Sequence, residues 1–206
     1  MSTLTLVLTV TGMLVTLFSA PSTAERAPVV SMLELRQASV VRQQWGLSCG
    51  AAALATLLRY QHGINITEKS VALGLIDNPE YLNDPSRLHR QQGFSLLDLK
   101  NFVDSIGLLG NGLGKLSLGD IADLAPVIIP VNLDGYNHFV VFRGLASNRV
   151  LLADPGWGNR VLSVEEFESS WISYPKLGKV GFSVSSDNPT HLTLLKPKAM
   201  DFVMLK

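Results

Sequence analysis

The chain has 206 residues, of which 17 are basic and 17 are acidic, so its formal net charge is zero; 47% of its residues are hydrophobic. This charge balance argues against a function in which the protein binds nucleic acid or an anionic membrane surface through a net positive charge. The length suits a single domain with a sizeable core.

Residues 1–24 have the pattern of a signal peptide. They carry no charged side chain and are apolar over residues 4–18. Ser22 and Ala24 supply small residues at positions −3 and −1, which predicts cleavage after Ala24 and a periplasmic location. The alternative is a retained anchor, and only then would the protein contact a membrane. The apolar run is short for a bilayer span of about 20 residues. The Lys or Arg that usually precedes the apolar run of a signal peptide is missing.

Residues 25–40 are predicted to form a linker or a lead-in strand, and residues 41–206 a single domain. The stretch QQWGLSCG at 43–50 contains Cys49, the only cysteine of the chain. Exported proteins usually pair their cysteines as disulfides, which a single thiol cannot do internally. Cys49 is therefore either a buried structural thiol or a nucleophile.

The residues after Cys49, GAAALATLLRY, predict a helix over about 49–60 with one apolar face and with Ser48 as its N-cap. Cys49 would then be the first helical residue, where unpaired N–H groups and the helix dipole favour a thiolate. The small residues at 50–53 would let another segment approach the start of the helix closely. A nucleophile is therefore the better interpretation of Cys49.

The chain between this helix and residue 106 is predicted to be mainly helical. Residues 67–76 (TEKSVALGLI) predict a second helix, and residues 77–93 predict a long loop near the cleft. Ser95 and Asp98 form a capping-box pattern at the start of a further helix.

From Ala125 onward the pattern is rich in β-strand residues. Strands are predicted in the runs PVIIPVN (126–132), HFVVFRGL (138–145), RVLLAD (149–154), KVGFSVS (179–185) and HLTLLK (191–196), with a short helix in VEEFESSWI (164–172).

His138 and Asp154 are the candidate partners of the thiol. They begin and end two strand runs joined by the turn-prone residues 146–148, so in a hairpin they should face each other, or nearly so. A carboxylate in this position can orient the imidazole and stabilise its charged form. The alternative is that His138 is an ordinary strand residue and Asp154 only starts a turn.

For the other histidines the sequence suggests no catalytic partner. His62 is interpreted as a cap or surface residue, His89 as part of an exposed loop, and His191 as the start of a closing strand. Acyl transfer also needs donors for the oxyanion, and the backbone N–H of Cys49 can be joined by the amide of Gln43 or Gln44. Spacing alone does not choose between the two glutamines.

No cofactor or metal is predicted. The glycine-rich loop GNGLGKLS at 110–117 lacks the pattern of a P-loop, since Leu109 and Leu116 stand where Gly and Ser or Thr are required. The histidines lack ligand spacing and a second thiol is absent. Trp45 and Trp157 either line the groove or pack at its rim.

The Gln-x5-Cys-Gly-Ala-Ala pattern at 43–52, His138 at the head of a strand, and Asp154 followed by Pro resemble the peptidase C39 family, which removes double-glycine leader peptides. The resemblance extends over about residues 41–171. It implies an α+β, papain-like fold, with a helical half that bears Cys49 and an antiparallel sheet that bears His138 and Asp154. It also selects Gln43 over Gln44.

The resemblance implies a cysteine endopeptidase whose partner is a polypeptide substrate. The chain is similar to the free-standing periplasmic members, including the accessory protease of functional-amyloid secretion, so a secretion machinery is a further expected partner. Two alternatives remain: an amidase or transpeptidase acting on cell-wall peptide with the same Cys, His and Asp, and a peptide-binding module without hydrolysis. The complete set of Gln43, Cys49, His138 and Asp154 argues against the second.

Overall fold

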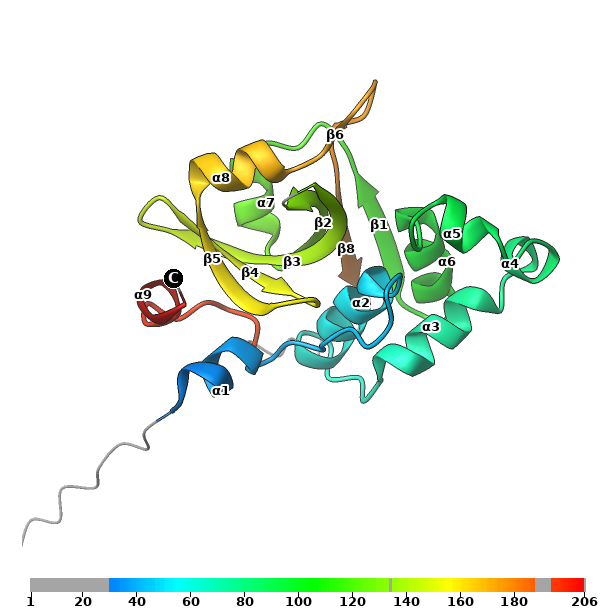
Figure 1. The fold of residues 1–206 in the computed structure, drawn as a ribbon, viewed down its shortest axis with the longest axis horizontal. Helices are drawn as coiled ribbons and strands as arrows, with labels where there is room; N and C mark the ends of the chain where they lie inside the picture. Colours follow the sequence, from blue (N-terminus) through cyan, green and yellow to red (C-terminus); the bar gives the residue numbers. More distant parts are fainter. Residues whose placement is uncertain (1–29, 134, 188–193, 206) are drawn as a thin grey trace, which may run out of the picture.

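The computed structural model describes residues 30–133, 135–187 and 194–205, and the predicted signal peptide lies outside these ranges. The first half of the described chain is helical (Figure 1). Its helices are α1 (Met32–Gln37), α2 (Cys49–Tyr60), α3 (Glu68–Ile76), α4 (Pro79–Asn83), α5 (Arg87–Arg90) and α6 (Leu96–Ser105).

The second half forms an antiparallel sheet of order β1-β8-β2-β3-β4-β5, a short pair β6-β7 and three helices. The sheet strands are β1 (Leu109–Leu113), β2 (Val127–Leu133), β3 (Tyr136–Ala146), β4 (Arg149–Asp154), β5 (Gly158–Ser163) and β8 (Gly181–Ser185). The remaining elements are α7 (Leu118–Leu124), α8 (Val164–Ser170), β6 (Ser173–Tyr174), β7 (Gly178–Lys179) and α9 (Asp201–Met204).

Both faces of the sheet are covered (Figure 1). Ile128 and Val141 pack in one core with α2, α3 and α6, whereas Ile129 and Val140 pack in a second core with α7 and α8. Because neighbouring strand residues point to opposite faces, a strand covered on both sides needs a continuous apolar run. This explains why the strand runs of the sequence do not alternate between polar and apolar residues.

Helix α2 lies at the centre of the molecule. Every residue from Cys49 to Leu58 is buried, so the helix has no polar face over this length, contrary to the single apolar face expected from its sequence. Its small residues allow this close packing: a Cβ added at Gly50 would lie 3.4 Å from the Phe139 ring of β3. The first turn of α2 is therefore held directly against the sheet.

The structure bears out several predicted elements. The helices at 49–60 and 67–76 are present as α2 and α3, and Ser95 with Asp98 forms the predicted capping box of α6. In this capping box, the Ser95 hydroxyl accepts the Asp98 N–H and the carboxylate accepts the Ser95 N–H.

Three other segments differ from the prediction. The expected linker or lead-in strand at 25–40 contains α1, which begins with a capping box of Ser31 and Glu34. The expected loop at 77–93 contains α4 and α5, too short to show a helical period. The expected glycine-rich loop at 110–117 begins as the edge strand β1, whose Gly110 lies against α6.

The expected closing strand at 191–196 falls partly outside the described ranges, and Leu194 and Leu195 lie in a turn. Among the described residues, no helix is long and apolar enough to cross a membrane.

Candidate active site

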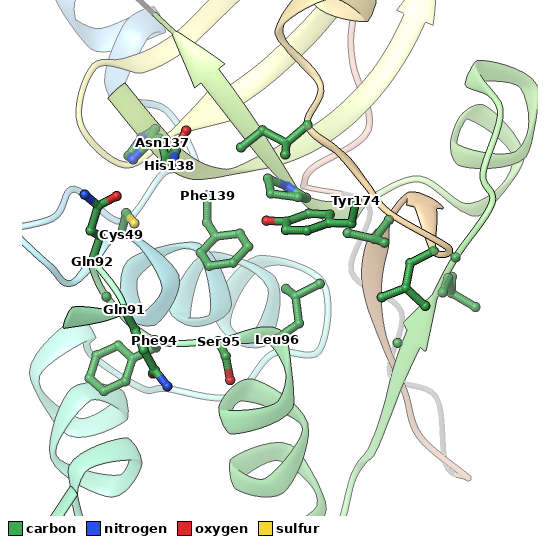
Figure 2. Close-up of a pocket in the computed structure, with 18 residues that line it drawn as sticks. Cys49, Gln91, Gln92, Phe94, Ser95, Leu96, Asn137, His138, Phe139 and Tyr174 are labelled. Atoms are coloured by element: carbon green, nitrogen blue, oxygen red, sulfur yellow. The ribbon is translucent and has the colours of Figure 1, made fainter. Parts of the chain in front are cut away.

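Cys49 and His138 lie together at one end of a pocket between the helices and the sheet (Figure 2). Cys49 is the first residue of α2 and is 3% exposed; His138 lies in β3 and is 7% exposed. The close contact between Gly50 and Phe139, which follow them in the chain, joins these two elements. The packing therefore brings together a thiol and an imidazole that are far apart in sequence.

The imidazole of His138 is oriented by Asp154 at the end of β4. Its Nε2 lies 2.7 Å from the carboxylate Oδ1, and both side chains are buried. Its Nδ1 is buried without a hydrogen-bond partner among the described residues. With Nε2 held by the acid, Nδ1 is the nitrogen left to exchange a proton with the sulfur.

The electrostatics of the pair favour a charged imidazole. Burial alone would lower the pKa of His138, but the hydrogen bond to Asp154, the interaction with Cys49 and the charges of both raise it to about 9. Burial would raise the pKa of Asp154, but its hydrogen bond to His138, the imidazolium charge and two backbone N–H groups lower it instead. At neutral pH the pair is therefore an imidazolium and a carboxylate.

Asp154 is held by the turn that follows it. The N–H groups of Gly156 and Trp157 donate to Oδ1 over 2.8 and 3.1 Å, and the Arg160 guanidinium lies 3.4 Å from Oδ2. A Cβ at Gly156 would lie 3.3 Å from Oδ1, so a larger residue would crowd the carboxylate. The DPGWG turn thus orients the acid as well as ending the strand.

The predicted facing of His138 and Asp154 is correct only approximately. Val141 pairs with Ala153, and the register shifts between Phe142 and Gly144, so that continuing it past Ala153 does not bring Asp154 opposite His138. The turn centres on two residues with positive φ, Ser147 and Asn148, within the predicted turn at 146–148. The two side chains still meet, because the bond runs diagonally between the strands.

Gln43 and Gln44 differ in their surroundings. The Gln43 N–H donates to the Pro155 carbonyl over 2.9 Å, which places its backbone beside the turn after Asp154. Its Nε2 makes only a 3.4 Å bond to the Trp45 carbonyl. The side chain of Gln44 is exposed, and its backbone N–H binds Glu68.

The other predicted histidines are not in this pocket. His62 follows the end of α2 and is buried, so the prediction that it could lie on the surface is wrong. His89 is exposed in α5, and His191 lies outside the described residues. Within the described ranges, no group of three His, Cys, Asp or Glu side chains could hold a metal ion.

The pocket has a volume of about 670 Å³ and extends from Cys49 along an apolar wall (Figure 2). Its apolar lining includes Phe94, Leu96, Leu113, Phe139, Ile172, Leu177 and Val180. Gln91, Gln92 and Gly93, at the end of the expected loop, also line it, and Figure 2 shows Gln92 beside Cys49. Trp45 and Trp157 are not part of the lining; both are about half exposed, and the Arg36 guanidinium stacks on Trp157.

Sequence reasoning missed three residues near the site. Tyr136 donates its hydroxyl to the Gly46 carbonyl over 3.0 Å, and burial and the charge of Cys49 raise its pKa. Arg42 donates to the carbonyls of Pro155 and Gly156. Glu68 is buried under the loop before Cys49. Only Tyr136 had a sequence signal, since it precedes His138 by two positions and so shares its face of β3.

Comparison with known proteins gives a consistent result. The model of the peptidase C39 family matches residues 37–175. Two relatives are each named "Probable functional amyloid protease FapD". The relative from Pseudomonas fluorescens is 37% identical over 181 residues, covering 84% of this chain and 76% of the relative. The relative from Pseudomonas aeruginosa is 35% identical over 144 residues, covering 69% of this chain and 61% of the relative.

Solved structures support the fold. A double glycine motif protease from an AMS/PCAT transporter, solved with its leader peptide, superposes with a TM-score of 0.56 at 23% identity and covers 75% of this chain and 96% of its own. The peptidase domain of Streptococcus ComA has a TM-score of 0.56 at 20% identity and covers 72% and 98%. The protein is thus a cysteine peptidase with an α+β, papain-like fold, and it belongs to the peptidase C39 family.

Proposed function

We propose that this peptidase is an endopeptidase that cleaves exported polypeptides after small residues, with Cys49 as nucleophile and His138 as general acid and base. Asp154 orients the imidazole, and Gln43 and the Cys49 N–H stabilise the oxyanion. The observation that carries the proposal is the state of His138: Nε2 is bound to Asp154, Nδ1 has no other described hydrogen-bond partner, and the pKa is about 9.

The reaction follows from this arrangement. The Cys49 thiolate attacks the carbonyl carbon of the scissile bond, and the carbonyl electrons move to the oxygen. The His138 imidazolium gives its proton to the leaving amine as the C–N bond breaks, which leaves a thioester on Cys49. Neutral His138 then takes a proton from water, whose oxygen attacks the thioester. Loss of the new carboxyl product restores the thiolate and the imidazolium.

The substrate class is supported from two directions. The apolar walls of the pocket suit a polypeptide segment that carries apolar side chains. One of the similar solved structures is a double glycine motif protease in complex with its leader peptide, and the two sequence relatives are named as probable functional amyloid proteases. We therefore extend the proposal to Gly-Gly before the cut, to a periplasmic location and to a secreted amyloid system as the source of substrate.

The test of the catalytic pair is alkylation of Cys49 by iodoacetamide from about pH 4 to pH 9. We expect rapid alkylation of the full chain below about pH 7, and in His138→Ala a reactivity that rises only near pH 8.5, as for an ordinary thiol. His89→Ala is the matched control, because His89 is exposed and outside the pocket. If the wild type and His138→Ala titrate alike, Cys49 is a structural thiol and the peptide-binding alternative stands.

Specificity is tested with peptides that differ only in the residues before the cut. Mass spectrometry should detect cleavage after Gly-Gly and much slower cleavage when Leu-Leu replaces it, if the site favours small residues before the cut. Equal cleavage of both peptides would contradict the preference for small residues. Cleavage of cell-wall stem peptides alone would support the amidase alternative.

A further inference from the structure

Glu68 is a buried acid that the proposed reaction does not use. It is the first residue of α3 and is 4% exposed. Both carboxylate oxygens accept the backbone N–H of Gln44, over 2.9 and 3.1 Å, and Oε1 also meets the Ser48 hydroxyl. An acid at the start of a helix is already stabilised by the dipole when it is exposed to solvent. Its burial under a loop instead costs desolvation, which these hydrogen bonds offset.

The two hydrogen-bond partners of Glu68 are sequence neighbours of the proposed oxyanion donor and of the nucleophile. Gln44 follows Gln43, and Ser48 precedes Cys49. One carboxylate thus joins both ends of the loop formed by residues 43–48, which leads from the proposed oxyanion donor to the nucleophile. The Tyr136 hydroxyl also binds this loop, because it donates to the Gly46 carbonyl.

Glu68 also explains an unusual helix start. Ser48 stands at the N-cap of α2, yet its side chain makes no capping bond; its hydroxyl lies against Glu68 and the Trp45 carbonyl instead. A Ser at this position normally accepts an N–H of the first helical turn. With the hydroxyl drawn away, it accepts none of the N–H groups of the first turn of α2.

Glu68 is itself held in place by packing. Thr67 caps α3 by accepting the Ser70 N–H over 3.1 Å, and Val71 and Leu75 of α3 lie in the core that also contains α2. The carboxylate therefore projects from an element that cannot move independently of the nucleophile helix.

We propose that Glu68 is a positioning residue that sets the geometry of the oxyanion donors by holding the Gln43–Ser48 loop. The inference rests on the proposed function in assigning acyl transfer to Cys49. It predicts that loss of the Glu68 carboxylate impairs attack on carbonyl groups, where an oxyanion forms, and spares displacement reactions, where none forms.

The test compares two small reagents on Glu68→Gln and wild type. p-Nitrophenyl acetate transfers its acetyl group to Cys49 through an oxyanion and releases p-nitrophenolate. Iodoacetamide alkylates the same sulfur and releases iodide without an oxyanion. We expect acetyl transfer to fall roughly ten- to a hundredfold, since small misplacements of catalytic groups carry losses of this size. We expect alkylation to change by less than about twofold, because it reports only the thiolate.

Two further variants control the comparison. Glu165→Gln removes an exposed acid from the first turn of α8 and should leave both rates unchanged. Ser48→Ala removes the bond at the Cys49 end of the loop while Glu68 stays, and should give an intermediate loss of acetyl transfer. Thermal melting confirms that each variant is folded.

The outcomes separate this inference from the proposed function. Equal losses of acetyl transfer and alkylation, or no loss of either, overturn the role of Glu68, as does a wild-type protein that p-nitrophenyl acetate does not acylate. A selective loss of acetyl transfer in a protein that cleaves no Gly-Gly peptide supports the role of Glu68 and overturns the proposed substrate.

Discussion

The helical side and the sheet side of the site obtain their geometry differently. Cys49 is placed by local structure, because it begins a helix whose whole first turn is buried. His138 and Asp154 are placed by pairing between strands, with a register shift between them and the hairpin turn. The sequence therefore predicts the position of the nucleophile directly, whereas it predicts the pairing of His138 and Asp154 only approximately.

The difference also appears in the charges. On the sheet side, the carboxylate of Asp154 accepts from His138, two backbone N–H groups and Arg160. On the helical side, Cys49 begins a buried helix of small and apolar residues, and the buried acid Glu68 is bonded to the preceding loop. The sheet side thus sets the pKa of His138, and the helical side positions the Cys49 sulfur. Substitutions on the two sides should therefore produce different kinetic defects.

The largest effect is expected for Cys49→Ala. Removal of the nucleophile should lower kcat by on the order of 10⁴-fold or more, because the other groups cannot form the thioester. The change removes one buried sulfur, so the melting temperature should shift by only a few degrees. Cleavage of a Gly-Gly peptide and thermal melting measure both. Residual cleavage within tenfold of the wild type would show that another residue is the nucleophile.

Asp154→Asn should give the next largest loss, on the order of a hundredfold in kcat, typical of impaired general acid–base catalysis. It should also change the pH profile. Asp154 and Cys49 together raise the pKa of His138 to about 9 against the effect of burial, so loss of the Asp154 hydrogen bond and charge should lower that pKa. Because the active pair requires a protonated imidazole, the alkaline fall in activity should move from about pH 9 to a lower pH. A fall that stays near pH 9 would contradict the assigned role of Asp154.

Gly50→Leu tests the contact that joins the two sides. A Cβ at Gly50 would already lie 3.4 Å from Phe139 and 3.6 Å from Phe94, so a leucine should push the start of α2 away from β3. Separation of Cys49 from His138 should lower kcat/KM by about a hundredfold. Iodoacetamide titration should then show a thiol closer to an ordinary one, since the imidazolium is more distant.

Gly50→Ala is the matched control for this experiment. Its Cβ fits at ordinary contact distances, and alanine favours the helix by roughly 0.5–1 kcal/mol over glycine. The control should therefore keep its activity and melt slightly higher. If Gly50→Leu retains full activity, the contact between Gly50 and Phe139 does not set the distance between the two sides.

Much of the fold could be predicted from the sequence where the signal is local. The helix after Cys49, the capping box at Ser95 and the strand runs between Val127 and Ser185 all carry short-range patterns of composition and spacing. The short helices α4 and α5 and the edge strand β1 were missed, because five residues or fewer do not show a period.

The site could be predicted only in part, for a related reason. Cys49, His138 and Asp154 belong to distinctive local patterns, so the sequence identifies them as candidates. Glu68 and Arg42 act through bonds to distant backbone groups, at sequence separations that no short pattern reveals. The register shift between Phe142 and Gly144 depends likewise on tertiary packing.

The smallest effect is expected for Arg160→Gln. Arg160 lies 3.4 Å from Asp154 Oδ2 and is partly exposed, so solvent and salt screen the attraction, and exposed pairs contribute about 0.2–1 kcal/mol. We expect kcat/KM to fall by no more than about fivefold, and the loss to shrink at high salt. Steady-state cleavage at low and high ionic strength measures it.

Arg42→Gln is the informative companion to Arg160→Gln, because Arg42 also lies beside the turn after Asp154 but binds carbonyl groups rather than the carboxylate. Its bonds to Pro155 and Gly156 tie the turn that orients the acid to the loop that carries Gln43. Its loss should therefore exceed that of Arg160→Gln and persist at high salt, because geometry rather than charge is disturbed. Equal, salt-sensitive losses in both variants would mean that the charge near Asp154, and not the position of the turn, controls the sheet side of the site.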